Sequence, residues 1–147
     1  MSSNLINNTL DACRSAIAVF KDRRRSKAAR KEFWALGLDE CIGVLNDIGM
    51  SPSEFNNAMH LPYAAENLLK LAMRSVGIDP DSFHTREFAS ESFMPRTCIT
   101  CLHRRRCHAH LEAFDFESHY REFCPNRDNI SELLRQRMRC LAGRKYS

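Results

Sequence analysis

The chain has 147 residues, of which 44% are hydrophobic and 27% are charged, and its formal net charge is +4. This length and composition suit one ordinary globular domain with a real core. No apolar run approaches the roughly 20 residues of a membrane span. The apolar stretch at residues 15–20 is too short for a signal-peptide core. We therefore expect a cytoplasmic protein without a membrane partner.

The charges are distributed unevenly along the chain. Residues 21–31 carry seven basic residues and one acid, residues 32–94 carry three basic residues and ten acids, and residues 125–147 carry six basic residues and two acids. A basic head and a basic tail thus flank an acidic middle.

Helical periodicity dominates, and strand signals are almost absent. The first helix is expected over residues 9–36, and the second over residues 39–47. We expect the basic part of the first helix, beyond Phe20, to project from the core. Its apolar face before that point is formed by Leu10, Cys13, Ile17 and Phe20.

A turn pattern then occurs twice, as IGMSPSEF at residues 48–55 and VGIDPDSF at residues 76–83. In each copy Gly can end a helix, and Ser or Asp followed by Pro can start the next one. Between the copies, residues 62–76 predict an amphipathic helix. Its buried side is expected to comprise Ala65, Leu68, Leu69, Ala72, Met73 and Val76.

Residues 84–97 are the least regular, and a short helix or loop ending at Pro95 is expected there. Helices are predicted over residues 103–114, 117–123 and 129–141. The last of them should turn inward Ile130, Leu133, Leu134 and Met138. The predicted fold is all-α, a compact bundle of five to seven short helices. Residues 1–37 would form a basic N-terminal helix or extension, and residues 38–147 a helical domain that holds the cysteine motif of residues 98–126.

Four of the seven cysteines form the pattern C-x2-C-x5-C-x16-C, namely Cys98, Cys101, Cys107 and Cys124. Clustered cysteines in a cytosolic chain indicate metal or redox chemistry more often than disulfides. The C-x2-C turn brings two sulfurs together. A helix that begins before Cys107, and a helical hairpin before Cys124, can return the other two. Four thiolates suit tetrahedral Zn²⁺ or a [4Fe–4S] cluster.

The cluster is slightly favoured over zinc in this prediction. The second half of the motif is not a zinc knuckle, and Pro125 directly follows a cysteine, as in ferredoxins. The C-x2-C-x5-C triplet is similar to the end of the cluster motif in DNA glycosylases of the endonuclease III type, although the fourth ligand lies upstream there. His108 and His110 are candidates to support the metal through hydrogen bonds to its ligands.

Two alternatives for these cysteines stay open. Buried free cysteines can serve as small hydrophobic residues, and Cys98 with Cys101 could form a redox dithiol. The remaining cysteines lie on apolar helix faces and are expected in the core. They are Cys13, Cys41 and Cys140.

Residues 38–135 resemble a family of small bacterial proteins classed as a domain of unknown function. The resemblance lies in the order of four segments, DIGMSPSEF, VGIDPDSF, CITCLHRRRCHAHL and REFCPN. The cysteine block and the closing C-P-N are its specific part. The resemblance implies no established activity. It implies that the motif positions are Cys98, Cys101, Cys107, Cys124, Pro125 and Asn126.

The basic head forms a second candidate site, on one helix. A dense positive surface can bind nucleic acid through phosphate contacts without reading sequence. It can also dock an acidic protein partner or pair with the acidic middle of the same chain, and we favour these two because no nucleic-acid-binding motif is present. Arg104, Arg105 and Arg106 could add to it. The helix residues concerned are Lys21, Arg23, Arg24, Arg25, Lys27, Arg30 and Lys31.

No Gly-rich phosphate loop, nucleophile elbow or H-E-x-x-H motif occurs, so we do not expect an enzyme. The sequence predicts a small cytosolic binding or regulatory protein with a four-cysteine metal centre that could respond to oxidant or iron. The alternative is a metal-free helical adaptor that binds a protein or RNA through its basic N-terminal helix. The sequence does not indicate whether the protein is a monomer or an oligomer.

Overall fold

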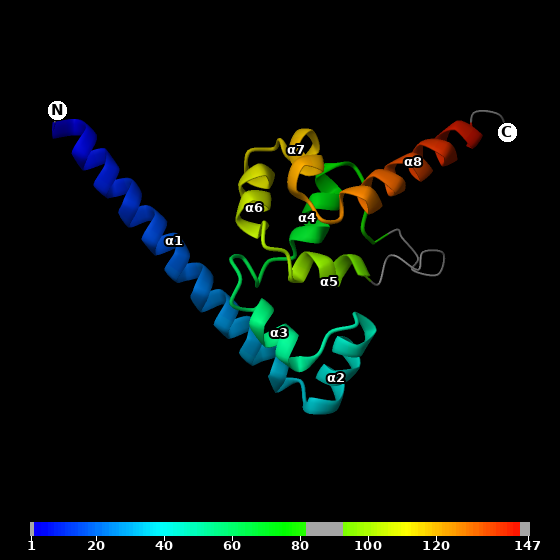
Figure 1. Ribbon diagram of the computed structural model, residues 1–147, viewed down its shortest axis with the longest axis horizontal. Helices are drawn as coiled ribbons and strands as arrows, with labels where there is room; N and C mark the ends of the chain where they lie inside the picture. The colour runs from blue at the N-terminus through cyan, green and yellow to red at the C-terminus, as the bar shows by residue number, and fades with distance from the viewer. Residues whose placement is uncertain (1, 82–92, 145–147) are drawn as a thin grey trace.

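The computed structural model describes residues 2–81 and 93–144 (Figure 1). These residues form eight α-helices and no strand, which confirms the all-α class with one helix more than the expected range. The helices are α1 (Ser2–Ala35), α2 (Leu38–Asp47), α3 (Pro52–Ala58), α4 (Leu68–Ser75), α5 (Phe93–Ile99), α6 (Arg104–Glu112), α7 (Phe116–Phe123) and α8 (Arg127–Arg144).

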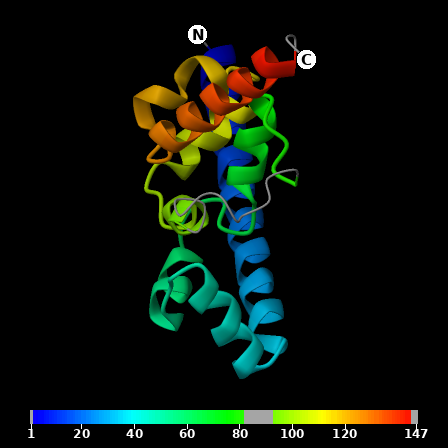
Figure 2. The same ribbon diagram turned by 90° about the vertical axis from the view of Figure 1, so that its right-hand side faces the viewer.

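Two groups of helices each have their own apolar core (Figures 1 and 2). In the smaller one, Phe33 and Trp34 at the end of α1 pack with Leu45 of α2 and Phe55 of α3. The larger one is built by α4 to α8 around Tyr120, which is 1% exposed. The α5 helix contacts both cores and thereby joins them, since Met94 lies in the larger core and Ile99 packs against the smaller one.

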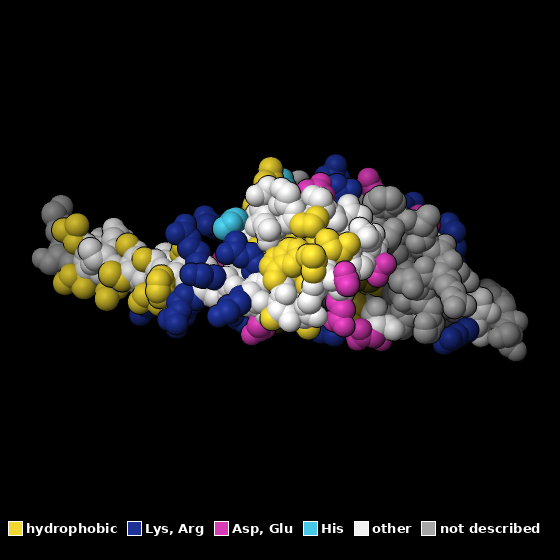
Figure 3. Space-filling view, turned by 90° about the horizontal axis from the view of Figure 1, so that it is seen from below, with side chains coloured by type: hydrophobic (Ala, Val, Ile, Leu, Met, Phe, Trp, Pro, Cys, Tyr) yellow, Lys and Arg dark blue, Asp and Glu magenta, His cyan; other side chains and the backbone are white. Residues whose placement is uncertain are grey.

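The long α1 helix reverses our expectation about which of its halves projects. Its apolar N-terminal half extends into solvent, where Leu10, Ile17 and Phe20 are 50%, 54% and 61% exposed. Figure 3 shows apolar side chains along the free end of α1, followed by lysines and arginines nearer the body. The basic half is the part that packs, because Ser26, Ala29 and Phe33 recur at helical spacing on the side toward α3.

The first copy of the turn pattern behaves as predicted. Gly49 has a positive φ of 73°. Ser51 then caps α3 through a capping box, because its side chain accepts the Glu54 N–H while the Glu54 carboxylate accepts the Ser51 N–H. In the second copy Gly77 has φ 81°. The helix predicted to follow it extends outside the described residues, as does most of the irregular segment 84–97.

Two predicted helix boundaries are wrong. The helix expected from residue 62 begins at Leu68, because the Asn67 side chain accepts the Lys70 N–H at 3.2 Å and caps α4 there. The residues before it form turns in which Tyr63 has φ 55°. In addition, Pro95 does not end a helix but lies in the first turn of α5, where a missing N–H costs no hydrogen bond.

The outlying cysteines and the last helix give a mixed outcome. Cys41 is fully buried and donates its thiol hydrogen to the Phe33 carbonyl at 2.9 Å, as expected of a core residue. Cys13 and Cys140 are exposed, so their prediction as core residues is wrong. In α8, Ile130 and Leu133 are buried, but Met138 is 69% exposed because this helix continues beyond the body (Figure 1). None of the described helices is both long enough and apolar enough to cross a membrane.

Candidate metal centre

The four cysteines of the motif come from consecutive elements. Cys98 lies in the last turn of α5, and the Cys101 N–H donates to the Cys98 carbonyl at 3.2 Å in the turn that follows. Helix α6 begins at Arg104 and carries Cys107 in its first turn. Cys124 is the C-cap of α7, and the chain turns there in an extended conformation before α8.

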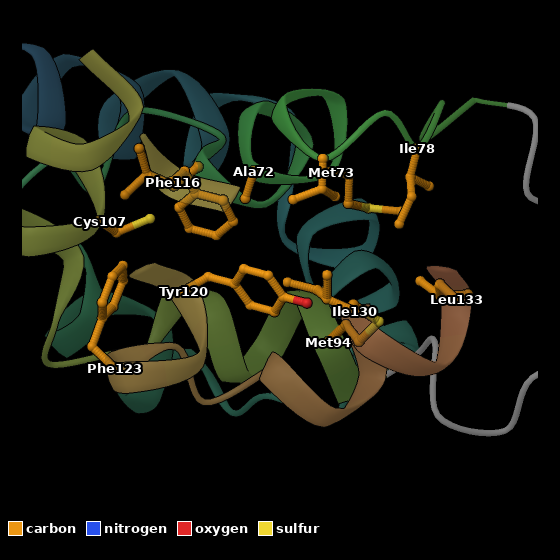
Figure 4. Close-up of a cluster of buried hydrophobic side chains, with 12 residues drawn as sticks. Ala72, Met73, Ile78, Met94, Cys107, Phe116, Tyr120, Phe123, Ile130 and Leu133 are labelled. Carbon is orange, nitrogen blue, oxygen red and sulfur yellow. The ribbon is translucent and has the colours of Figure 1, made fainter. Parts of the chain in front are cut away.

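All four cysteines line one small cavity of about 20 Å³, which is room for about one water molecule. The α6–α7 hairpin therefore brings the fourth cysteine back to the first three, as the spacing predicted. Figure 4 shows Cys107 at one end of the larger apolar core, beside Phe116 and Phe123. The remaining walls are mostly apolar and include Leu68, Leu69, Ala72, Phe123 and Ile130.

Backbone N–H groups point at three of the four sulfurs. The His103 N–H donates to Cys101 Sγ at 3.2 Å. The Leu69 N–H is directed at Cys98 Sγ and the Asn126 N–H at Cys124 Sγ, and each contact lowers the pKa of its cysteine against the effect of burial. Such donors stabilise negative charge on sulfur, and they are a means by which proteins tune cysteine-bound metals.

A buried arginine lies at the same cavity. Arg104 is 3% exposed, and its guanidinium donates to the carbonyls of Cys98 (2.7 Å) and Tyr63 (2.6 Å). It also donates to the carbonyls of Pro62 and Glu66 at 3.0 and 2.9 Å. The sequence placed Arg104 with Arg105 and Arg106 on a basic surface. The one sequence signal for its burial is that it lies three residues before Cys107, which puts the two side chains on the same face of α6.

Without a cation between them, these thiols favour the neutral form. Burial raises the pKa of Cys98, raises that of Cys107 to about 12, and raises that of Cys124 to about 11. Repulsion among the neighbouring thiolates acts in the same direction for all three pKa values, and the charge of Arg104 opposes it at Cys98 and Cys107. A metal cation would reverse this balance, because coordination deprotonates the thiol outright.

Two further observations test whether a metal would fit. The Asn126 side chain is buried at the cavity, and its Oδ1 accepts no hydrogen bond, which is unusual for a buried carbonyl.

In the described part of the chain, no three cysteine sulfurs lie within 4.8 Å of one another. A Zn–S bond of about 2.3 Å requires sulfurs roughly 3.8 Å apart. A cubane holds its sulfurs on a wider tetrahedron, because each binds a different iron.

The spread of the sulfurs thus favours a cluster, whereas the small volume of the cavity favours a single ion. Both measures depend on rotamers, since a cysteine Sγ moves about its χ1 angle as an apolar side chain such as Leu69 does. The preference for the cluster therefore rests on the motif, whose second half is not a zinc knuckle and in which Pro125 directly follows a cysteine. The donor set is suitable for either metal.

The two histidines proposed to support the metal are directed elsewhere. His108 stacks on Tyr63 with ring centroids 3.7 Å apart, and its Nε2 lies 3.6 Å from Glu66. The His110 Nδ1 lies 2.8 Å from an Asp115 oxygen. Neither histidine is among the residues that line the cysteine cavity.

His110 belongs to a different cluster, which the sequence did not reveal. The ligand atoms of His110, Asp115 and His119 all lie within 4.8 Å of one another at the α6–α7 turn. A hydrogen bond and ring stacking already satisfy these groups, because His110 bonds Asp115 and stacks on His119 at 4.5 Å. This half-exposed surface cluster is a second place where a divalent ion can bind, and any metal analysis must separate it from the cysteines.

The basic residues of α1 divide between two sides of the helix. Arg25 lies 3.5 Å from Glu66, and Arg24 lies over the ring of Phe20. Arg23, Lys27 and Arg30 instead line a cavity between α1 and residues 59–63. Lys21 and Lys31 are exposed.

No protein-family model matches the chain, and neither a curated protein nor a solved structure does. The resemblance to a bacterial domain family therefore stays a prediction.

Proposed function

We propose that the chain is a cytoplasmic, metal-centred binding or regulatory protein whose Cys98, Cys101, Cys107 and Cys124 hold one centre. The observation that carries the proposal is that all four residues line a single cavity, although up to 26 positions of sequence separate them. Four cysteines that served only as small hydrophobic residues would have no reason to converge in this way.

The centre would hold the C-terminal helices together. Its ligands come from α5, the turn after it, α6 and the end of α7. Such short helices bury little apolar surface, and a bound metal would compensate for this. The free energy of metal binding would then contribute to the free energy of folding.

A [4Fe–4S] cluster is the favoured occupant, and Zn²⁺ is the alternative. The backbone N–H groups directed at three of the sulfurs support the cluster, as does a motif whose second half is not a zinc knuckle. Cys98, Cys101 and Cys124 are only partly buried, so small oxidants can reach the site from solvent. This access supports a role in sensing oxidant or iron.

The test compares single Cys→Ser variants purified without oxygen, with iron, sulfide and zinc measured per chain. Cys107→Ser and Cys124→Ser are expected to lower the bound metal to well below half of the wild-type content. Cys13→Ser and Cys140→Ser are matched controls, because these cysteines are exposed and outside the motif. His119→Ala controls for an ion at the surface cluster.

The metal-free helical adaptor makes the opposite prediction. If the motif variants keep wild-type folding and metal content, the metal centre is wrong. If only His119→Ala loses zinc, the ion belongs to the α6–α7 turn, and the cysteine proposal fails as well.

A further inference from the structure

The second cavity lies between α1 and residues 59–63 and has a volume of about 460 Å³, within the usual range of about 300–1,000 Å³ for small-ligand sites. Its walls are the packed half of α1, residues 59–63 and the start of α6. We refer to it as the basic pocket. Its charged lining comprises Asp22, Arg23, Lys27, Arg30 and Arg105, and its other polar residues are Ser26, His60 and Tyr63.

The charge of the basic pocket is strongly positive. Arg23, Lys27 and Arg30 lie on successive turns of one face of α1, and Arg105 adds a fourth cation from α6. The carboxylate of Asp22 is the acid in the lining, and it accepts the Tyr63 backbone N–H at 2.9 Å. Four cations less one anion leave a net charge of +3, with His60 beside Arg30 at 3.4 Å.

These cations are available to a ligand. Within residues 2–81 and 93–144, Arg23, Lys27 and Arg105 have no ion-pair partner. The neighbouring arginines differ, because Arg25 lies against Glu66 and Arg106 against Glu122. Three cations without an ion-pair partner therefore lie together at the pocket, although Lys21, Arg24 and Lys31 of α1 also lack such a partner within the described residues.

A buried hydroxyl marks the centre of this lining. Ser26 is 5% exposed, and its Oγ has no hydrogen-bond partner. It lies three residues after Arg23 and four before Arg30, on the same face of α1. Most buried polar groups in folded proteins are paired. An orphan hydroxyl between two unneutralised arginines indicates that an oxygen-rich anion completes the site.

The rest of the lining selects among anions. Met59, Leu61 and Pro62 form an apolar wall opposite the cations, which suits an organic moiety rather than a bare ion. A phosphate monoester carries about −1.5 to −2 charges at pH 7, which matches the pocket better than a carboxylate does. A backbone phosphodiester carries one charge between two sugars, so it reaches a buried hydroxyl less easily than a terminal phosphate.

We propose that the basic pocket binds a terminal phosphate monoester, with Arg23, Lys27, Arg30 and Arg105 around its oxygens and the Ser26 hydroxyl donating to one of them. The ester's organic part would contact Met59, Leu61 and Pro62. This site is independent of the metal proposal, because it shares no lining residue with the cysteine cavity.

The experiment is calorimetric titration of the full chain with adenosine 5′-monophosphate, with adenosine, and with an RNA hexamer that carries either a 5′-phosphate or a 5′-hydroxyl. Adenosine 5′-monophosphate is expected to bind with a saturable isotherm, and adenosine at least about tenfold more weakly. Arg30→Gln is expected to weaken binding about tenfold, and Ser26→Ala about threefold. Arg24→Gln is the matched control, because Arg24 lies over Phe20 and outside the pocket.

The RNA probes identify the source of the phosphate. Equal affinity for adenosine 5′-monophosphate and 5′-phosphorylated RNA supports a free nucleotide-like ester, and much tighter binding of that RNA alone supports an RNA 5′ end. Binding of both RNAs regardless of the 5′-phosphate would overturn the proposal in favour of a diffuse electrostatic surface. The absence of saturable binding up to about 1 mM, or equal losses in Arg24→Gln and Arg30→Gln, would overturn it too.

Discussion

The side chain of Arg104 connects the cysteine cavity with the segment before α4. Its guanidinium donates to four backbone carbonyls, of Pro62, Tyr63, Glu66 and Cys98. These carbonyls belong to turns and a helix end. Those of Tyr63, Glu66 and Cys98 also accept one backbone N–H each, so the arginine supplies their second hydrogen bond. The planar fork of a guanidinium can satisfy several of them at once, which a lysine cannot do.

Replacement of this side chain should therefore be costly. Arg104→Met keeps much of the side-chain volume but leaves four carbonyls without this donor, and we expect the free energy of unfolding to fall by about 3 kcal/mol. Urea denaturation followed by circular dichroism measures this free energy of unfolding. Arg105→Met, at an exposed neighbour, should change the free energy by less than about 0.5 kcal/mol. Equal effects of the two variants would contradict the role of Arg104.

Glu54 forms a second link at the residue scale. Its carboxylate caps α3 through Ser51 and lies 2.9 Å from Arg96 of α5. The Ser51 backbone N–H is the largest cause that holds the pKa of Glu54 below its usual 4.5. Desolvation opposes it in part, and the charge of Arg96 adds to the lowering. The folded state thus favours the ionised carboxylate.

This shift predicts a pH-dependent effect of Glu54→Gln. A lowered folded-state pKa stabilises the fold above the unfolded-state value, and the contribution is lost as the pH falls through the folded-state value. The variant should melt below the wild type at pH 7, and the two melting temperatures should converge below pH 4.5. A difference that stays constant from pH 7 to acid would show that the charge of Glu54 is not involved.

At the scale of elements, α1 has two halves with different roles. The N-terminal half exposes its apolar side chains, whereas Phe33 near its end lies 4.4 Å from the ring of Phe55 and 5.2 Å from that of Trp34. Only the second half therefore contributes to the core of the chain.

Substitutions in the two halves should differ accordingly. Ile17→Ala should change the free energy of unfolding by less than about 0.5 kcal/mol, because Ile17 is 54% exposed. Phe33→Ala should lower it by about 2 kcal/mol, since it removes ring contacts in the smaller core. Thermal and urea unfolding of both variants measure this contrast. A large loss in Ile17→Ala would mean that the projecting half of α1 is covered in solution.

The same helix shows what local sequence could and could not predict. Periodicity identified α1, α2, α6, α7 and α8, because apolar spacing follows from the geometry of the helix itself. The direction in which α1 packs depends on α3, which lies far along the chain, and periodicity carries no such information. The start of α4 was missed because the Asn67 cap competes with a pattern that continues to Pro62.

In the candidate site, too, local features could be predicted from the sequence and contacts between distant segments could not. The spacing of the cysteines predicted their convergence, since a turn and a helical hairpin bring them together locally. The burial of Arg104 and the gathering of Arg23, Lys27, Arg30 and Arg105 at one pocket depend on contacts between distant segments. From the sequence alone these basic residues could be described only as members of two separate charge runs.

For the molecule as a whole, the proposed metal acts on one of its two cores. The ligands belong to the larger group of helices, while α2 and α3 have an apolar core without any of them. Removal of the metal with a chelator should increase amide hydrogen exchange in residues 97–126 and leave residues 41–59 close to their original protection. Exchange that increases equally in both segments, or in neither, would contradict a centre that orders the C-terminal helices locally.

The proposed role of the larger core depends on one metal centre held by Cys98, Cys101, Cys107 and Cys124. The absorption spectrum of protein purified without oxygen, with iron, sulfide and zinc quantified per chain, tests this centre. We expect a brown protein with a broad band near ~400 nm and about four irons and four sulfides per chain. About one zinc per chain that is lost in Cys107→Ser would keep the centre and change its metal. A colourless, well-folded protein without iron or zinc would show that these cysteines hold no metal.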